Sequence, residues 1–237
     1  MSTYGSKIIA FEGLDGCGKD TQVDLLLKYF DENNIKYYYA KQLETDLGHY
    51  IRENYLAGDK DKEHTVLDML FAAERFSYCK ELFKHLRNGE YIVMNRFLLS
   101  ALAYGTYVFL VKNNNAFDDY YCFIKDINKY VWQAFYPGIT FYLDISPEDS
   151  MARIRARNGN KEIYDNLEKL NNISKAYEIT IEREYEPNAH EGLRWMDPKL
   201  VRINAVDSID NIHETVVSEF IKYKEEVEKH ENNIAGN

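Results

Sequence analysis

The chain contains few residues of the kinds that separate one domain from another. Only four of its 237 residues are proline, and no stretch is rich in serine and glycine. Linkers and low-complexity segments are therefore not expected, and 45% hydrophobic residues are enough for one sizeable α/β core. We predict a single domain over residues 1–225, followed by a polar C-terminal tail over residues 226–237.

Cysteines and long apolar runs are also scarce. Cys17, Cys79 and Cys122 are scattered along the chain without the spacing of a zinc site or a disulfide framework. This usage is typical of a reducing compartment and predicts a cytoplasmic protein, or one in the host cytoplasm if the source is viral. No apolar run is long enough to span a bilayer, and no signal-peptide pattern precedes the first apolar run, so no membrane partner is expected.

Basic residues are outnumbered by acidic ones. The chain has 29 lysines and arginines against 39 aspartates and glutamates, a net charge of −10. This balance argues against a protein that coats nucleic acid, and no nucleic-acid partner is expected. It does not argue against a nucleotide-binding protein, because binding phosphate requires only a local cluster of cations.

The most informative segment is residues 7–22, which read KIIAFEGLDGCGKDTQ. A short apolar run predicts a buried strand, a glycine-rich turn and Lys19 follow, and apolar residues at helical spacing then predict an amphipathic helix. This order is the context of a phosphate-binding P-loop, in which backbone N–H groups and a helix N-terminus face the phosphates and the lysine adds a full charge. The predicted ATP-binding residues are Gly13, Gly16, Cys17, Gly18, Lys19, Asp20 and Thr21.

Two positions in the loop are unusual. The P-loop pattern predicts Ser or Thr after the lysine as a Mg²⁺ ligand, whereas this chain has Asp20, followed by Thr21. A carboxylate is a good ligand for this hard cation, so Asp20 is predicted to bind Mg²⁺. Cys17 lies at a helix N-terminus beside Lys19, which favours a reactive thiolate. Alternatively, Cys17 is a small residue tolerated in a serine position.

Apolar segments alternate with helical patterns along the rest of the chain. Five strands are predicted, over residues 7–11, 36–41, 91–94, 140–144 and 200–204. Alternating strands and helices predict an α/β fold of the P-loop NTPase type, a parallel five-stranded sheet with helices on both faces. Ligands of such sheets bind at the carboxyl ends of the strands.

Several segments, in matching order over about 220 residues, resemble the thymidylate kinases (dTMP kinases). FEGLDGCGKDTQ is similar to their P-loop, and LDMLFAAERF, residues 67–76, resembles their substrate-binding helix. MNRFLLSALAYG, residues 94–105, is similar to their DRY segment, and residues 139–157 resemble the strand and helix that lead to a mobile lid, here about 153–166. The resemblance implies a nucleoside monophosphate kinase that uses ATP and Mg²⁺, and such kinases are commonly homodimers.

The resemblance also implies roles for single residues. Lys19 and Arg96 would act on the donor and acceptor phosphates, with Asn95 beside them. Because no variable residue of the P-loop is basic, a further cation for the transferring group would come from the lid arginines Arg153, Arg155 or Arg157. Their spacing of two cannot gather them on one helix face.

The implied substrate-binding residues are Asp15 for the 3′-OH, Phe71 stacking on the base, Arg75 at the base carbonyl, Arg96 at the phosphate, Ser100 bordering the base and Tyr104 beneath the sugar. Taken alone, Phe71 and Tyr104 could be core residues and Arg75 a solvated surface residue.

Some positions depart from the family pattern. Asn95 replaces the Asp of DRY, and residues 41–45, KQLET, replace R-E-P-G-G-T. Relative to the family pattern, Asp20 adds a carboxylate near the metal and Asn95 removes one, so their number is unchanged. This suggests that the two substitutions compensate for each other; independent drift is the alternative. Three functions therefore remain open: a dTMP kinase, a kinase for a modified deoxynucleotide such as a 5-substituted dUMP, and a nucleotide-binding homologue with weak or no activity.

Overall fold

The computed structural model describes residues 7–56, 64–111, 116–157, 166–185 and 198–235. Within these residues the sheet has five parallel strands in the order β2-β3-β1-β4-β5. They are β1 (Ile8–Glu12), β2 (Tyr37–Lys41), β3 (Tyr91–Asn95), β4 (Ile139–Asp144) and β5 (Lys199–Asn204). The predicted fold class and all five predicted strands are confirmed, with bounds that differ by at most one residue.

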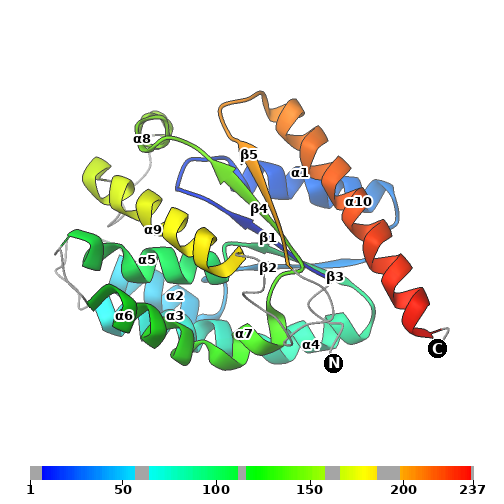
Figure 1. The fold of residues 1–237 in the computed structure, drawn as a ribbon, viewed down its shortest axis with the longest axis horizontal. Coiled ribbons are helices and arrows are strands. Elements are labelled where there is room, and N and C mark those ends of the chain that lie inside the picture. Colours follow the sequence, from blue (N-terminus) through cyan, green and yellow to red (C-terminus); the bar gives the residue numbers. More distant parts are fainter. Residues whose placement is uncertain (1–6, 57–63, 112–115, 158–165, 186–197, 236–237) are drawn as a thin grey trace.

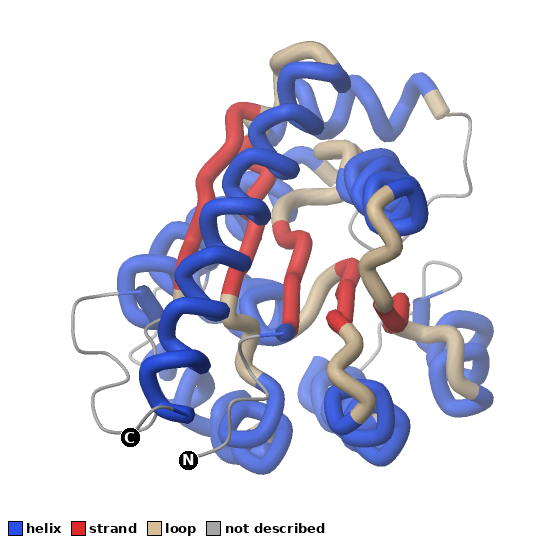
Figure 2. Tube along the Cα trace, turned by 90° about the vertical axis from the view of Figure 1, so that its right-hand side faces the viewer, coloured by secondary structure: helices blue, strands red, loops and turns tan. Residues whose placement is uncertain are grey.

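Helices cover both faces of this sheet (Figures 1 and 2). They are α1 (Lys19–Glu32), α2 (Asp46–Ile51) continued by the π-helical turn η2 (Arg52–Leu56), α3 (His64–Ser77), α4 (Cys79–Arg87), α5 (Leu98–Val111), α6 (Ala116–Ile127), α7 (Lys129–Phe135), α8 (Pro147–Ala156), α9 (Leu167–Tyr185) and α10 (Ile209–Ala235). No described helix is long and apolar enough to cross a membrane.

The central strand β1 shows why both faces are covered. All five of its side chains are buried, which is typical of a parallel strand between two helix layers. Ile9 and Phe11 belong to a core cluster with Phe30 of α1 and Phe220 of α10. Ile8 and Ala10 point to the other face, into a cluster formed with α4, α5, α6 and α7.

The helix α10 extends into the segment predicted as a polar C-terminal tail. Residues 226–235 continue α10, and Val227 within them is buried. The sequence pattern after Glu226 does not indicate this continuation, because six polar or charged residues follow Val227.

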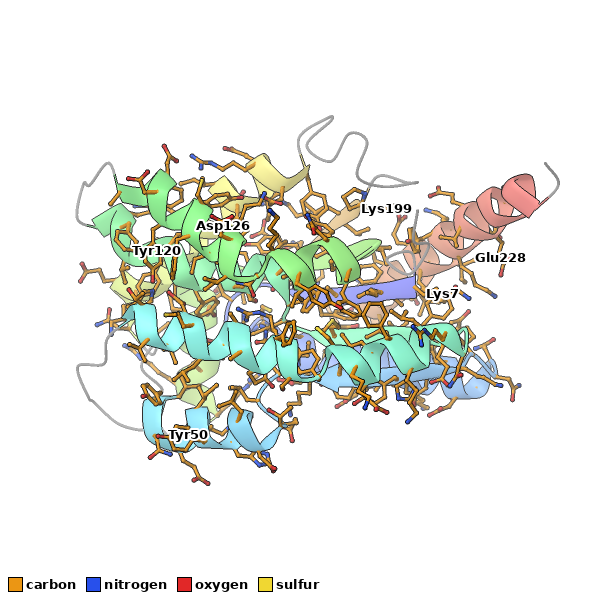
Figure 3. All side chains as sticks on the ribbon, turned by 90° about the horizontal axis from the view of Figure 1, so that it is seen from below. Lys7, Tyr50, Tyr120, Asp126, Lys199 and Glu228 are labelled. Carbon is orange, nitrogen blue, oxygen red and sulfur yellow. The ribbon has the colours of Figure 1, made fainter. Side chains whose placement is uncertain are left out.

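The order of the strands determines where a ligand can bind. β1 lies between β3 and β4, and the chain crosses from one side of β1 to the other between these two strands. The register pairs Phe11 with Asn95 and Glu12 with Tyr142. The carboxyl ends of β1, β3 and β4 therefore meet at one edge, the switch point at which α/β sheets bind ligands. Figure 3 shows Lys7 and Lys199, which lie at or before the amino ends of strands, at the opposite end of the molecule from Tyr50 and Tyr120.

Candidate active site

The P-loop connects β1 to α1 and requires glycine at defined positions. Gly13, Gly16 and Gly18 have φ angles of +136°, +77° and +103°, a region in which residues with a Cβ are strained. A Cβ on Gly13 would also lie 2.5 Å from the carbonyl oxygen of Leu143 on β4. The loop therefore holds its backbone close to the neighbouring strand, in a conformation that residues with a Cβ would not adopt without strain.

Lys19 begins α1 and is buried. Its ammonium group donates hydrogen bonds to the carbonyl oxygens of Gly13 (3.1 Å) and Leu14 (2.7 Å). Burial lowers the pKa of Lys19, and the positive charge of Arg96 lowers it further. The energetic cost of this buried cation is a reason to expect that an anion is its functional partner.

Arg96 follows β3 and occupies a left-handed conformation, with φ of +66°. Its backbone N–H donates to the carbonyl oxygen of Phe11 (2.9 Å), which fixes the chain at the end of β1. The guanidinium group donates to the carbonyl oxygen of Gly13 (2.8 Å) and to the Tyr177 hydroxyl (3.1 Å), and it forms an ion pair with Asp15. Non-glycine residues with positive φ are found mostly where surrounding contacts enforce them, often at functional sites.

Asp15 lies within the P-loop beside Arg96 and Tyr104. The Tyr104 hydroxyl donates to its carboxylate (3.1 Å). Burial opposes ionisation of Asp15, but the charges of Arg96 and Lys19 outweigh it and hold the pKa below its usual value. Asp15 is therefore a carboxylate over the whole physiological range and can accept a hydrogen bond from a ligand hydroxyl.

A cavity of about 120 Å³ opens on the α3 side of the P-loop. It contains every predicted substrate-binding residue, namely Asp15, Phe71, Arg75, Arg96, Ser100 and Tyr104. Arg75 is not a solvated surface residue: it is buried, and its Nε donates to Asn128 Oδ1 (2.9 Å). Phe71 is half-buried, with part of its surface facing the cavity.

A second cavity, of about 330 Å³, lies on the opposite side of the P-loop. Gly16, Cys17, Gly18 and Thr21 line it from the loop and α1, and Arg153 and Arg157 line it from α8. The P-loop thus separates two cavities: one is lined by all the residues predicted to bind an acceptor nucleotide, and the other by four of the seven predicted to bind ATP. Gly13, Lys19 and Asp20 do not line the donor-side cavity.

The three lid arginines have different surroundings, in keeping with their spacing. The guanidinium group of Arg153 donates to the carbonyl oxygens of Ala205 (2.8 Å) and Cys17 (3.4 Å), against the P-loop. Arg157 is exposed and lines the donor-side cavity, whereas Arg155 is exposed and does not line it. Residues 158–165 of the predicted lid lie outside the described residues.

Asp20 and Asn95 are in direct contact. Asn95 Nδ2 donates to Asp20 Oδ1 (2.7 Å), although the two residues are 75 positions apart. Asp20 is exposed, and its Oδ2 accepts no hydrogen bond from any described residue. The described residues contain no group of three or more His, Cys, Asp and Glu side chains that could enclose a metal ion. One carboxylate beside a phosphate-binding loop fits Mg²⁺, which is usually held by one or two carboxylates together with substrate phosphates.

Cys17 is 1% exposed, and its sulfur lies 3.4 Å from the Lys19 ammonium. Burial contradicts the prediction of a readily alkylated thiol, since a reactive cysteine must be accessible. The alternative, a small side chain in a serine position, agrees with this environment. The sequence alone could not settle the question, because it does not show which side of the loop faces the core.

Other residues at the site were not indicated by sequence patterns. Glu12 is buried at the end of β1, where it accepts hydrogen bonds from the backbone N–H groups of Phe97 (2.8 Å) and Ser100 (3.2 Å). The Tyr177 hydroxyl of α9 lies 2.7 Å from Ser100 Oγ. A charged residue ending an apolar strand is a signal that could have identified Glu12. Tyr177 has no such signal, because an aromatic residue in an amphipathic helix usually indicates core.

The chain matches known proteins over most of its length. A family model described as thymidylate kinase matches residues 11–216. A thymidylate kinase of Plasmodium falciparum (isolate 3D7) is 31% identical over 225 residues, which cover 94% of this chain and 93% of that protein. A probable thymidylate kinase of Methanococcus aeolicus is 30% identical, over 92% of this chain and 98% of that protein. A thymidylate kinase of Prochlorococcus marinus (strain NATL2A) is 30% identical, over 91% and 96%. With the P-loop, the two cavities and these matches, the chain belongs to the thymidylate kinase family.

Proposed function

We propose that this protein transfers the γ-phosphoryl group of ATP to dTMP, giving dTDP and ADP. One observation carries the proposal: two cations of the site, one from the P-loop and one from the acceptor cavity, donate to the same carbonyl oxygen. Lys19 approaches the carbonyl oxygen of Gly13 from the P-loop (3.1 Å), and Arg96 approaches it from the acceptor cavity (2.8 Å). A phosphoryl group that passes between the two cavities would pass beside both charges.

Positioning and charge neutralisation are sufficient for this reaction. The acceptor phosphate is itself the nucleophile, so no residue has to remove a proton from it, and catalysis depends on alignment and on stabilising charge on the transferring group. Lys19 would neutralise the β- and γ-phosphates of ATP, and Arg96 would hold the acceptor phosphate. Arg153 and Arg157 are the lid arginines nearest the donor-side cavity, which favours them over Arg155 as the further cations.

Mg²⁺ is proposed as the metal cofactor and Asp20 as its protein ligand. When bound there, the ion would supply charge neutralisation at the donor phosphates that lysine and arginine cannot provide alone. The free Oδ2 of Asp20 and the hydrogen bond from Asn95 to Oδ1 support this assignment, because the amide orients the carboxylate without competing for its second oxygen.

A coupled assay of ADP release against a panel of nucleoside monophosphates tests the proposal. With ATP and Mg²⁺, dTMP is expected to give the highest kcat/KM. Family membership favours dTMP over a modified deoxynucleotide as the main substrate. Absence of ADP release with every monophosphate would refute a kinase and favour a nucleotide-binding homologue.

Phe71 tests the acceptor cavity. Replacement by alanine is expected to weaken the binding free energy of dTMP by about 1–3 kcal/mol, the value of one base–aromatic stacking contact. Calorimetry would measure the affinity and thermal unfolding the stability. Phe71→Leu is the matched control, because it keeps most of the apolar volume and removes the aromatic face. If Phe71→Leu binds dTMP as the wild type does, Phe71 is a packing residue and not a stacking platform.

A homodimer through the outward face of α3 is also proposed. Met69 and Phe76 are 52% and 57% exposed, and Val66 and Ala73 complete an uncharged stripe along this face. Tyr130 of α7 extends it through a ring contact with Phe76 (5.3 Å between centroids). A two-fold dimer would place this self-complementary face against its own copy and bury the stripe.

Phe76→Glu is expected to convert the dimer to a monomer, because it would bury a charge at the two-fold interface. Sedimentation equilibrium would measure the mass. Ile221→Glu, at an exposed position of α10, is the control and should leave the dimer intact. A monomeric wild-type protein, or a dimer that survives Phe76→Glu, would exclude this face.

A further inference from the structure

One wall of the acceptor cavity carries an acidic side chain that has no place in the reaction described above. Asp68 lines the cavity and is 8% exposed. It stands on α3 three residues before Phe71 and seven before Arg75, so all three share one face of the helix. A buried carboxylate is costly unless it has partners, which makes its presence in a nucleotide pocket informative.

The two oxygens of this carboxylate have different surroundings. Oδ2 accepts a hydrogen bond from the Tyr120 hydroxyl (2.8 Å) and lies 3.7 Å from His64 Nε2. Oδ1 accepts no hydrogen bond from any described residue. Gly105 of α5 leaves room beside Oδ1: a Cβ at this position would lie 3.5 Å from it. Tyr120 therefore fixes the orientation of the carboxyl group and leaves one acceptor oxygen available.

We propose that Asp68 reads the N3–H group of the pyrimidine base, with Arg75 reading the adjacent carbonyl, so that the two residues select thymine over cytosine. This inference rests on the proposed function. Thymine presents a carbonyl oxygen next to an N–H donor, whereas cytosine presents an amine next to a bare ring nitrogen. A donor at Arg75 and an acceptor at Asp68 complement the carbonyl oxygen and the N–H group of thymine. With cytosine, Arg75 would face an amine donor and Asp68 would face a ring nitrogen that is an acceptor.

The geometry of α3 supports this pairing. The Cα atoms of residues seven apart on a helix are separated by about 10.5 Å, and helical side chains lean toward the N-terminus. The long Arg75 side chain thus leans back toward Asp68, and each influences the ionisation of the other. Phe71 lies between them, so a base that stacks on its ring would have one residue at each end of its hydrogen-bonding edge. Arg75 is held by Asn128 through Nε, and this leaves its terminal nitrogens to donate.

Ionisation of Asp68 should make the affinity for dTMP depend on pH. Burial raises its pKa to about 6, against the opposing influences of His64, Tyr120 and Arg75. The titratable groups that influence or are influenced by it are His64 and Arg75 on α3, Tyr107 on α5 and Tyr120 on α6. Above this value the carboxylate can accept the N3–H bond; below it, protonation removes the preferred acceptor form. The affinity for dTMP is therefore expected to fall as the pH drops through about 6.

Binding of dTMP and dCMP by Asp68→Asn tests the proposal. The Tyr120 hydroxyl would retain the amide oxygen and direct the NH₂ group into the cavity, where it opposes N3–H of thymine and matches N3 of cytosine. The Kd for dTMP is expected to rise about 10- to 100-fold, the range for a hydrogen bond to a charged group, and the Kd for dCMP to fall. Asp68→Leu should lose dTMP affinity without gaining dCMP affinity. Asp126→Asn, an exposed position on the same helix as Tyr120, is the control and should change neither (Figure 3).

The measurement is calorimetric and needs no turnover, so it is separable from the kinase assay. Lack of phosphoryl transfer by the wild type would refute the proposed function. The ratio of dTMP to dCMP affinity would still decide the role of Asp68. The pH profile of dTMP affinity should lose one titration in Asp68→Asn; the titration of the nucleotide phosphate near pH 6 is common to both proteins and cancels in the comparison. An unchanged ratio of dTMP to dCMP affinity in Asp68→Asn would overturn the proposal and leave Asp68 as a structural partner of Tyr120.

Discussion

Replacing Lys19 with alanine is expected to lower the rate of phosphoryl transfer by about 10³-fold or more while the protein remains folded. Removing one preorganised donor from a site that stabilises developing charge commonly costs about 10²–10³ in kcat, and Lys19 also carries a full charge. Stability should not suffer in proportion. The ammonium group is buried next to Arg96, so its removal relieves both desolvation and repulsion between like charges. The measurements are steady-state ADP release and the midpoint of thermal unfolding.

Lys28→Ala is the matched control for this experiment. Lys28 lies on the same helix, its side chain is 72% exposed, and its ion pair with Glu32 spans 3.8 Å at the surface. Such pairs contribute little, so this variant should keep both activity and stability. Turnover by Lys19→Ala within a few-fold of the wild type would contradict the assignment of the P-loop as the donor site.

The sheet could be predicted from the sequence because its strands are short apolar runs between turn residues. The strand predicted over residues 7–11 lies at Ile8–Glu12, and the one predicted over residues 91–94 lies at Tyr91–Asn95. Buried parallel strands give this clear signal since both of their faces must be apolar. The P-loop could be predicted for a related reason: glycine at three positive φ angles leaves a pattern that few other structures require.

The partners of individual side chains could not be predicted in the same way. The hydrogen bond between Asp20 and Asn95 depends on β3 lying next to β1, which becomes known only with the strand order. Glu12 is satisfied by groups more than 80 residues away in the chain. Asp68 lies in a helix whose apolar spacing predicts core, and no local pattern indicates that it faces a cavity. Long-range contacts of this kind depend on the fold as a whole, and a single sequence contains no direct record of them.

The second large effect is expected from Asp20 and Asn95, which should act as one unit in binding Mg²⁺. Asp20→Ser is expected to raise the Mg²⁺ concentration for half-maximal turnover about 10-fold or more, because a neutral hydroxyl replaces a charged ligand. Asn95→Asp should also impair the enzyme, since it would place two carboxylates within 2.7 Å of each other beside the phosphates. The double variant is expected to recover much of the activity: the serine hydroxyl can donate to the new carboxylate, and the number of charged ligands returns to one. Asp24→Ser, an exposed position one turn later on α1, controls for the loss of negative charge near the site.

A double-mutant cycle separates metal binding from the hydrogen bond itself. Residues in contact commonly show coupling energies of about 0.5–3 kcal/mol, and the contact alone would produce such coupling in stability without any metal. The cycle is therefore measured twice, once on the Mg²⁺ requirement for turnover and once on thermal unfolding in a chelator. If Asp20 is the ligand, coupling appears in the Mg²⁺ requirement and exceeds the coupling measured without metal. If the two effects on the Mg²⁺ requirement are additive, Asn95 is a simple loss of the family carboxylate, and Asp20 is only its hydrogen-bond partner.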